Sequence, residues 1–83
     1  MNERASDPDS PAVTLDCRGR RCPYPVIALA RALPTVPAGA LLRVLADDPA
    51  AAVDIPAWCR MRGQDLVAVS TVDGCSGYDV RRA

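Results

Sequence analysis

The chain has 83 residues, of which 49% are hydrophobic, enough for one small domain with a single modest core. Ten cationic and ten acidic residues give a formal net charge of zero, which disfavours general attraction to nucleic acid or to anionic membranes. No apolar run approaches the ~20 residues that a membrane-spanning helix needs. We therefore expect function to lie at an exposed residue or on a docking surface, since so short a chain seldom encloses a large pocket.

Residues 1–12 are polar, and we expect them to form a flexible tail ahead of a domain at residues 13–83. The tail lacks the features of a secretory signal. Four cysteines in such a chain indicate free thiols in a reducing compartment, so we predict a cytoplasmic protein. Histidine and C-x-x-C pairs are both absent from the sequence, so we expect no metal site and no cofactor.

The first two predicted elements flank a short cysteine-containing segment. Alternating apolar and polar side chains predict a strand at residues 13–15. A helix is expected directly after Cys22, because Pro23 and Pro25 suit the first helical turn. An apolar stripe at helical spacing continues to Leu33, where the following proline ends the helix.

The next two elements are a strand and a second helix. Residues 41–46 form a nearly continuous apolar run, which predicts a mostly buried strand parallel to the first. Two interpretations of the helix stay open because of Pro56. Either Asp48 caps a helix that kinks at Pro56, or Asp54 caps a shorter helix with Pro56 in its first turn. In both, the helix ends at Gly63.

The last part of the chain has the pattern of a β-hairpin. β-branched residues predict a strand at residues 65–72, and Asp73-Gly74 is a hairpin signal that leads to a fourth strand at residues 78–80. The order is therefore strand, helix, strand, helix, strand, strand. With right-handed crossovers, this order predicts an α/β (α+β) two-layer sandwich, a four-stranded mixed sheet with both helices on one face.

Cys22 is the main candidate for a reactive residue, because it stands where the first helix is expected to begin. First-turn amides and the helix dipole place partial positive charge near its sulfur, and the adjacent Arg21 adds a cation. We therefore expect a thiol pKa near ambient pH, with Pro23 and Pro25 shaping the helix entrance. A thiolate of this kind attacks other sulfur atoms, so the segment indicates sulfur chemistry.

The remaining polar residues around Cys22 have two interpretations. Arginines on a solvated surface need no function, but next to a cysteine they also suit a docking face for carboxylates or phosphates. We predict that Arg18, Arg20 and Tyr24 contribute to partner docking, while Arg21 supports the thiolate.

The ordered motifs resemble those of the TusA/SirA/YedF sulfur-carrier family across residues 13–82. The matching elements are Leu15-Asp16-Cys17-Arg18-Gly19, Cys22-Pro23-Tyr24-Pro25-Val26, Asp47-Asp48-Pro49, Asp54-Ile55-Pro56-Ala57-Trp58-Cys59 and Gly63. Cys-Pro-x-Pro alone is a weak signal, whereas the whole set in this order and spacing is specific. The resemblance implies the two-layer sandwich and a role for Cys22 in holding sulfane sulfur as a persulfide.

The resemblance also implies partners. Such proteins accept sulfur from a cysteine desulfurase or rhodanese-like donor and pass it to an acceptor, such as a DsrE-like protein or a transfer-RNA thiolation enzyme. Family routes lead to tRNA thiolation, molybdenum-cofactor sulfuration and sulfur oxidation, and the sequence leaves this choice open. No membrane and no direct nucleic-acid partner is expected. The chain departs from many relatives at Arg20, Tyr24 and Gln64, the last where histidine is common.

The other cysteines have simpler structural interpretations. Cys17 could form a transient disulfide with Cys22, but packing at a strand end is the simpler expectation. Cys59 and the neighbouring Trp58 are expected in the core. Cys75 follows the predicted hairpin turn, so we expect it to be exposed.

Asp47, Asp48 and Asp54 are three carboxylates close together in the sequence. By residue type they suit a metal cluster or an acid pair. Capping of the second helix explains Asp48 or Asp54 more simply, so capping is the favoured interpretation.

Three functions compete. The leading hypothesis is a sulfur relay protein, not a stand-alone enzyme, in which a Cys22 thiolate takes sulfur from a donor persulfide and yields it to an acceptor thiolate. No general base is needed if the thiol pKa is near ambient, which agrees with a chain lacking histidine. The alternative is a non-catalytic interaction or regulatory module in which Cys22 is structural. A thiol-disulfide oxidoreductase is disfavoured by the missing C-x-x-C pair.

Overall fold

The structure, a computed structural model, describes residues 10–83, so most of the predicted tail, residues 1–9, lies outside the described part of the chain. The elements follow in the order β1 (Val13–Asp16), α1 (Tyr24–Ala32), the 3-10 turn η2 (Leu33–Thr35), β2 (Leu41–Ala46), α2 (Ala51–Arg62), β3 (Asp65–Val72) and β4 (Cys75–Arg81). None of the helices among these residues combines the length and apolar character that crossing a bilayer requires.

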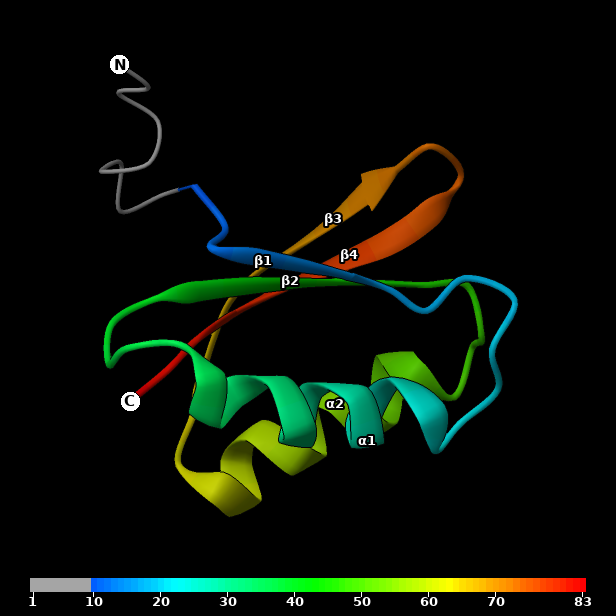
Figure 1. The fold of residues 1–83 in the computed structure, drawn as a ribbon. Helices are drawn as coiled ribbons and strands as arrows, with labels where there is room; N and C mark the ends of the chain where they lie inside the picture. The colour runs from blue at the N-terminus through cyan, green and yellow to red at the C-terminus, as the bar shows by residue number, and fades with distance from the viewer. Residues whose placement is uncertain (1–9) are drawn as a thin grey trace.

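The four strands form one mixed sheet in the order β1-β2-β4-β3. β1 pairs in parallel with β2, and β4 pairs antiparallel with both β2 and β3. Both helices lie on one side of this sheet (Figure 1). The predicted fold class and element order are therefore confirmed, and the parallel β1–β2 pair places the ends of both strands at the same edge.

The core lies between the helices and the sheet. Leu42 and Val80 are partners across β2 and β4, so both side chains point to the same face, and neither is exposed. Leu29 of α1 and Ile55 of α2 enter the same cluster from the helix side, each 0% exposed. Cys17 also belongs to this cluster, as expected for a cysteine packed at a strand end.

An ion pair that the sequence did not predict lies across β2 and β4. Arg43 and Asp79 are register partners, with Nε donating to Oδ1 at 2.7 Å and Nη2 donating to Oδ2 at 3.0 Å. Asp79 is only 8% exposed, so its carboxylate needs this two-point partner. The pair therefore fixes the two central strands side by side on the sheet face opposite the core.

Helix α2 settles the two interpretations left open by Pro56. The helix is continuous from Ala51 to Arg62 with Pro56 inside it, and Asp54 already lies in its first turn. The shorter helix capped by Asp54 is therefore wrong. Asp48 is not the N-cap either, since that residue is Ala50 and no side chain caps the helix. Asp48 lies two residues earlier, and its Oδ1 accepts the backbone N–H of Ala50 at 3.0 Å. The helix ends at Gly63 as predicted, in the left-handed conformation that glycine adopts readily, with a φ of 68°.

Two further expectations need correction. Cys75 is buried, not exposed, because β4 begins at Cys75 directly after a two-residue turn, three residues earlier than predicted. Asp73 and Gly74 have φ angles of 50° and 80°, the positive values that two-residue hairpin turns favour. Trp58 is only partly buried and packs against the edge of the core, whereas Cys59 lies in the core as expected.

Replacement of Ile55 by alanine should destabilise the domain strongly. Its side chain is fully buried, so truncation removes apolar contacts and leaves a cavity, which lowers the free energy of unfolding by about 2–5 kcal/mol. Val53→Ala is a matched control on the same helix, because Val53 is 69% exposed and its truncation should change this free energy by less than about 0.5 kcal/mol. Urea unfolding followed by circular dichroism measures both. Equal losses would contradict the assignment of the buried face of α2.

Candidate functional site

The candidate site is built on the loop between β1 and α1. The loop begins at Cys17, whose backbone N–H donates to the carbonyl of Leu45 in β2 at 2.8 Å, so the end of β1 is tied to the sheet. It turns at Gly19 and closes with Arg20, whose N–H donates to the carbonyl of Cys17 at 3.1 Å. The buried Cys17 side chain therefore holds the loop's base against the core.

Two carboxylates that follow β2 hold the rest of the loop. Both side-chain oxygens of Asp47 accept the backbone N–H of Gly19, at 3.0 and 3.1 Å. Asp48 accepts the backbone N–H of Cys22 through Oδ2 at 2.9 Å, while its Oδ1 binds Ala50. These backbone hydrogen bonds hold the pKa of Asp48 below its usual value. Asp48 thus joins the backbone of Cys22 to the start of α2.

Cys22 lies two residues before α1, close to the predicted helix entrance. Pro23 directly precedes the helix, and Pro25 is buried in its first turn. The N–H of Tyr24 donates to the carbonyl of Arg21 at 2.9 Å, so the chain turns tightly around the cysteine. The Cys22–Pro23 peptide bond is cis, and the Cys22 side chain is partly buried.

The electrostatic surroundings of the Cys22 thiol differ from the sequence prediction. Partial burial, a hydrogen bond to the Asp54 carboxylate, and the negative charges of Asp54 and Asp48 raise the thiol pKa to about 11. This direction is opposite to the expected pKa near ambient pH, and no arginine is among the causes of the shift. With its pKa raised in this way, the Cys22 thiol is protonated at neutral pH.

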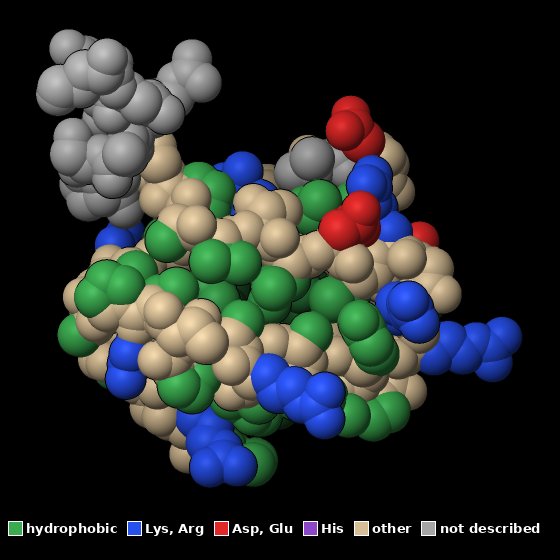
Figure 2. Space-filling model, viewed as in Figure 1, with side chains coloured by type: hydrophobic (Ala, Val, Ile, Leu, Met, Phe, Trp, Pro, Cys, Tyr) green, Lys and Arg blue, Asp and Glu red, His purple; other side chains and the backbone are tan. Residues whose placement is uncertain are grey.

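The arginines of the loop take different positions. Arg18 forms an ion pair with Asp16 through Nε to Oδ1 at 2.8 Å and Nη2 to Oδ2 at 2.7 Å, which lowers the pKa of Asp16 to about 2. The Arg20 guanidinium lies over the Tyr24 ring, 4.9 Å from its centroid. Arg21 is exposed. Cationic side chains are spread over the face seen in Figure 2, whereas the acidic ones visible there lie toward one end.

An open depression of about 610 Å³ borders the cysteine. Its lining joins the loop to the residues after β2: Gly19, Arg20, Arg21, Cys22, Asp47, Asp48, Pro49 and Ala50. Among residues 10–83, no three histidine, cysteine or acidic side chains are arranged to hold a metal ion. A partly buried thiol on the rim of an open depression is accessible to a sulfur atom presented by another molecule.

Comparison with known proteins agrees with this geometry. The family model described as "Sulfurtransferase TusA" matches residues 13–80. The chain belongs to the TusA family. A member of that family, "Sulfur carrier protein TusA" from Pseudomonas syringae pv. syringae (strain B728a), is 41% identical over 68 residues, which cover 82% of this chain and 81% of the relative. The protein is therefore a TusA-family sulfur carrier.

Two carboxylates act at this TusA-family site in ways that the sequence does not predict. Asp54, one of two candidate caps of the second helix, lies in the first turn of α2 and contributes to the raised pKa of the Cys22 thiol. Asp47, for which the sequence suggests no partner, holds Gly19. A signal for both was present, because parallel strands end at the same edge, so the loop after β1 must meet the residues after β2.

Alkylation of Cys22 should report the raised thiol pKa. We expect its rate with iodoacetamide to increase with pH up to about 11, because only the thiolate reacts. At pH 8 the folded protein should react roughly ten- to a hundredfold more slowly at Cys22 than the unfolded chain. Peptide-resolved mass spectrometry separates Cys22 from the other cysteines.

Asp54→Asn is the informative variant in this experiment. It removes the charge that favours the protonated thiol, so the midpoint of the pH profile should move to lower pH. Asp65→Asn, which alters an exposed carboxylate at the start of β3, is the matched control and should leave the midpoint in place. A midpoint unchanged by Asp54→Asn would show that this carboxylate does not govern the thiol.

Proposed function

We propose that this TusA-family protein carries sulfane sulfur as a persulfide on Cys22, between a donor and an acceptor protein of the cytoplasm. The main support is the position of the Cys22 thiol. It is partly buried on the rim of an open depression, and Asp48 holds its backbone N–H. A fixed yet accessible thiol suits transfer between macromolecules, because each partner must bring its own sulfur to the same point.

The loading step is a thiol exchange in which no net oxidation occurs. The Cys22 sulfur attacks the outer sulfur of a donor persulfide, R–S–SH, as the S–S bond of the donor breaks. Cys22–S–SH forms, and the donor leaves as a thiolate that takes up a proton. In the unloading step, an acceptor thiolate attacks the outer sulfur of Cys22–S–SH as its S–S bond breaks. The acceptor persulfide forms, and Cys22 leaves as a thiolate that takes up a proton from water.

Asp54 gives the loading step a proton acceptor. The raised thiol pKa means that a proton must leave Cys22 before or during attack, and the chain has no histidine to take it. The Asp54 carboxylate already accepts the hydrogen bond from this thiol. A carboxylate is a far weaker base than this thiolate, so Asp54 can pass the proton toward the departing donor thiolate only as the S–S bond of the donor breaks.

The family resemblance supports a cysteine desulfurase or a rhodanese-like protein as donor, and a DsrE-like protein or a tRNA-thiolation enzyme as acceptor. Around Cys22, Arg20 and Tyr24 form a stacked pair and Arg21 is exposed. These side chains supply cationic and aromatic contacts of the kinds enriched at protein interfaces. We assign partner docking to them and give Arg18 a lesser part, because Asp16 already neutralises it.

Loading of the protein by a cysteine desulfurase with cysteine tests the proposal directly. Intact and peptide masses should show one added sulfur atom on Cys22, and none in Cys22→Ser. Cys75→Ala is the matched control, since it removes a different thiol and should still load. A folded protein that forms no persulfide on Cys22 with a cysteine desulfurase or with a rhodanese-like donor would favour the alternative, an interaction module in which Cys22 is structural.

The exposed loop arginines should govern the rate of partner association. In an Arg20→Gln/Arg21→Gln variant, the rate of sulfur transfer should fall roughly three- to tenfold at low ionic strength, with less effect at high salt. The unfolding midpoint should not change, because both side chains are exposed. Arg31→Gln/Arg60→Gln removes the same charge from exposed helix positions and serves as the control. Equal transfer rates in the two double variants would reject the docking role.

A further inference from the structure

Strand β3 forms one open edge of the sheet. It lies at the end of the strand order and pairs with β4 alone, so the backbone groups on its other side face away from the sheet. β1, the strand at the opposite edge, has four residues, whereas β3 has eight. An open edge of this length is a template on which a further strand can pair.

The sequence of β3 has few of the features that protect sheet edges from association. Residues 66–72 contain no charged residue and no proline, and residues 67–71 are all exposed. A register irregularity between Leu66 and Ala68 interrupts the strand near its start, and the pairing with β4 is regular from Ala68 onward. The later part of β3 is therefore regular, uncharged and open, a combination that favours association through the edge.

Val69 shows how much of this strand the helices leave uncovered. It is the register partner of Tyr78, a core residue that is 3% exposed, so both side chains point to the helix side of the sheet. Val69 is nevertheless 57% exposed. The turn end of the β3–β4 hairpin rises away from the helices, which accounts for this difference (Figure 1). An apolar side chain on the core face of the sheet is thus mostly open to solvent.

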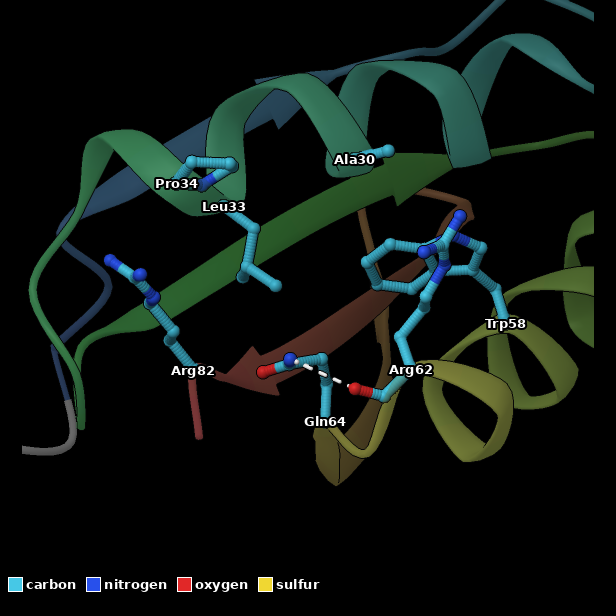
Figure 3. A pocket seen from close by; sticks show the side chains of 7 residues that line it. All are labelled: Ala30, Leu33, Pro34, Trp58, Arg62, Gln64 and Arg82. Atoms are coloured by element: carbon cyan, nitrogen blue, oxygen red, sulfur yellow. Dashed lines mark hydrogen bonds between the residues drawn. The ribbon is translucent and has the colours of Figure 1, made fainter.

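The start of β3 is different, because it directly follows the end of α2. Where the helix passes into the strand, Gln64 Nε2 donates to the carbonyl of Arg62 at 3.2 Å (Figure 3). Leu66, two residues further on, is partly buried and packs against the core. The helix layer therefore covers the first residues of β3 and leaves the later ones for a neighbour outside the domain.

We propose that two copies of this chain associate by antiparallel pairing of their β3 edges. The two-fold axis of such a pair is perpendicular to the sheet, so two four-stranded sheets become one, with all helices on the same face. The uncharged run then lies against its own copy, and the two Val69 side chains lie on the same face near the axis. Because each copy uses its β3 edge, assembly ends at a dimer.

A second copy fits this edge better than an unrelated extended peptide. It supplies a strand of the same length, without charge over the same run, and with an apolar side chain on the face where Val69 is open. The lining of the depression beside Cys22 includes no residue of β3, so both sulfur sites stay accessible in the dimer. The inference therefore does not depend on sulfur transfer.

Sedimentation velocity of the full chain from about 10 µM to about 1 mM, with a reductant to prevent disulfides, measures this association. We expect a concentration-dependent shift from monomer to dimer. Val69→Lys and Thr71→Lys each place a charge on the exposed edge and should raise the dissociation constant of the dimer roughly tenfold or more. Thr14→Lys puts the same charge on an exposed position of β1 and is the matched control, which should leave the constant unchanged.

Two further measurements make the test specific to β3. Backbone amide signals of residues 66–72 in NMR spectra should shift as the protein concentration rises, while those of β1 should not. The thermal unfolding midpoint of each variant, extrapolated to low concentration, should match that of the parent protein, because all three substituted positions are exposed.

Three results would overturn the proposal. The first is a protein that stays monomeric at about 1 mM. The second is a dimer that Thr14→Lys weakens but Val69→Lys and Thr71→Lys do not, since its interface would lie on another surface. The third is growth beyond the dimer, because a two-fold β3 pair closes the assembly.

Discussion

The bond between the Asp48 carboxylate and the backbone of Cys22 is the constraint on which the site depends. A nine-residue helix and a short loop would not by themselves fix a cysteine at one point. Asp48 ties that loop to the start of α2, and Asp47 ties the same loop at Gly19. The anchors are charged acceptors on backbone donors, which are among the stronger hydrogen bonds in proteins. The residues that directly follow β2 therefore hold the backbone that carries the Cys22 sulfur.

Asp48 also affects the chemical character of the sulfur. Partial burial of the Cys22 thiol, followed by the effects of Asp54 and Asp48, raises the thiol pKa and keeps the group protonated. Oxidation follows thiolate character, so a protonated Cys22 resists adventitious oxidants while it waits for a partner. Reactivity at Cys22 then depends on removing a proton from the thiol.

The fold followed from the sequence because local pattern and overall topology agree. Apolar periodicity, proline positions and the Asp73-Gly74 turn located the elements and their order. The site was harder, because residues far apart in sequence determine its electrostatics. The helix dipole and Arg21 belong to the neighbours of Cys22 along the chain, whereas Asp48 and Asp54 act on its thiol only through the tertiary structure. The partly buried ion pair of Arg43 and Asp79 is not predictable for the same reason, since only the β2–β4 register brings the two residues together.

The placement of β4 has a consequence for how the chain is made. β4 is the last strand to be synthesised, yet it lies between β2 and β3 and pairs with both. Until it leaves the ribosome, β2 has only β1 beside it and β3 has no partner strand. Leu42 then lacks its β4 neighbour Val80, and Arg43 lacks its ion-pair partner Asp79. A nascent chain can thus carry Cys22 and its carboxylates before the sheet beneath them is closed, and sheet closure must wait for β4.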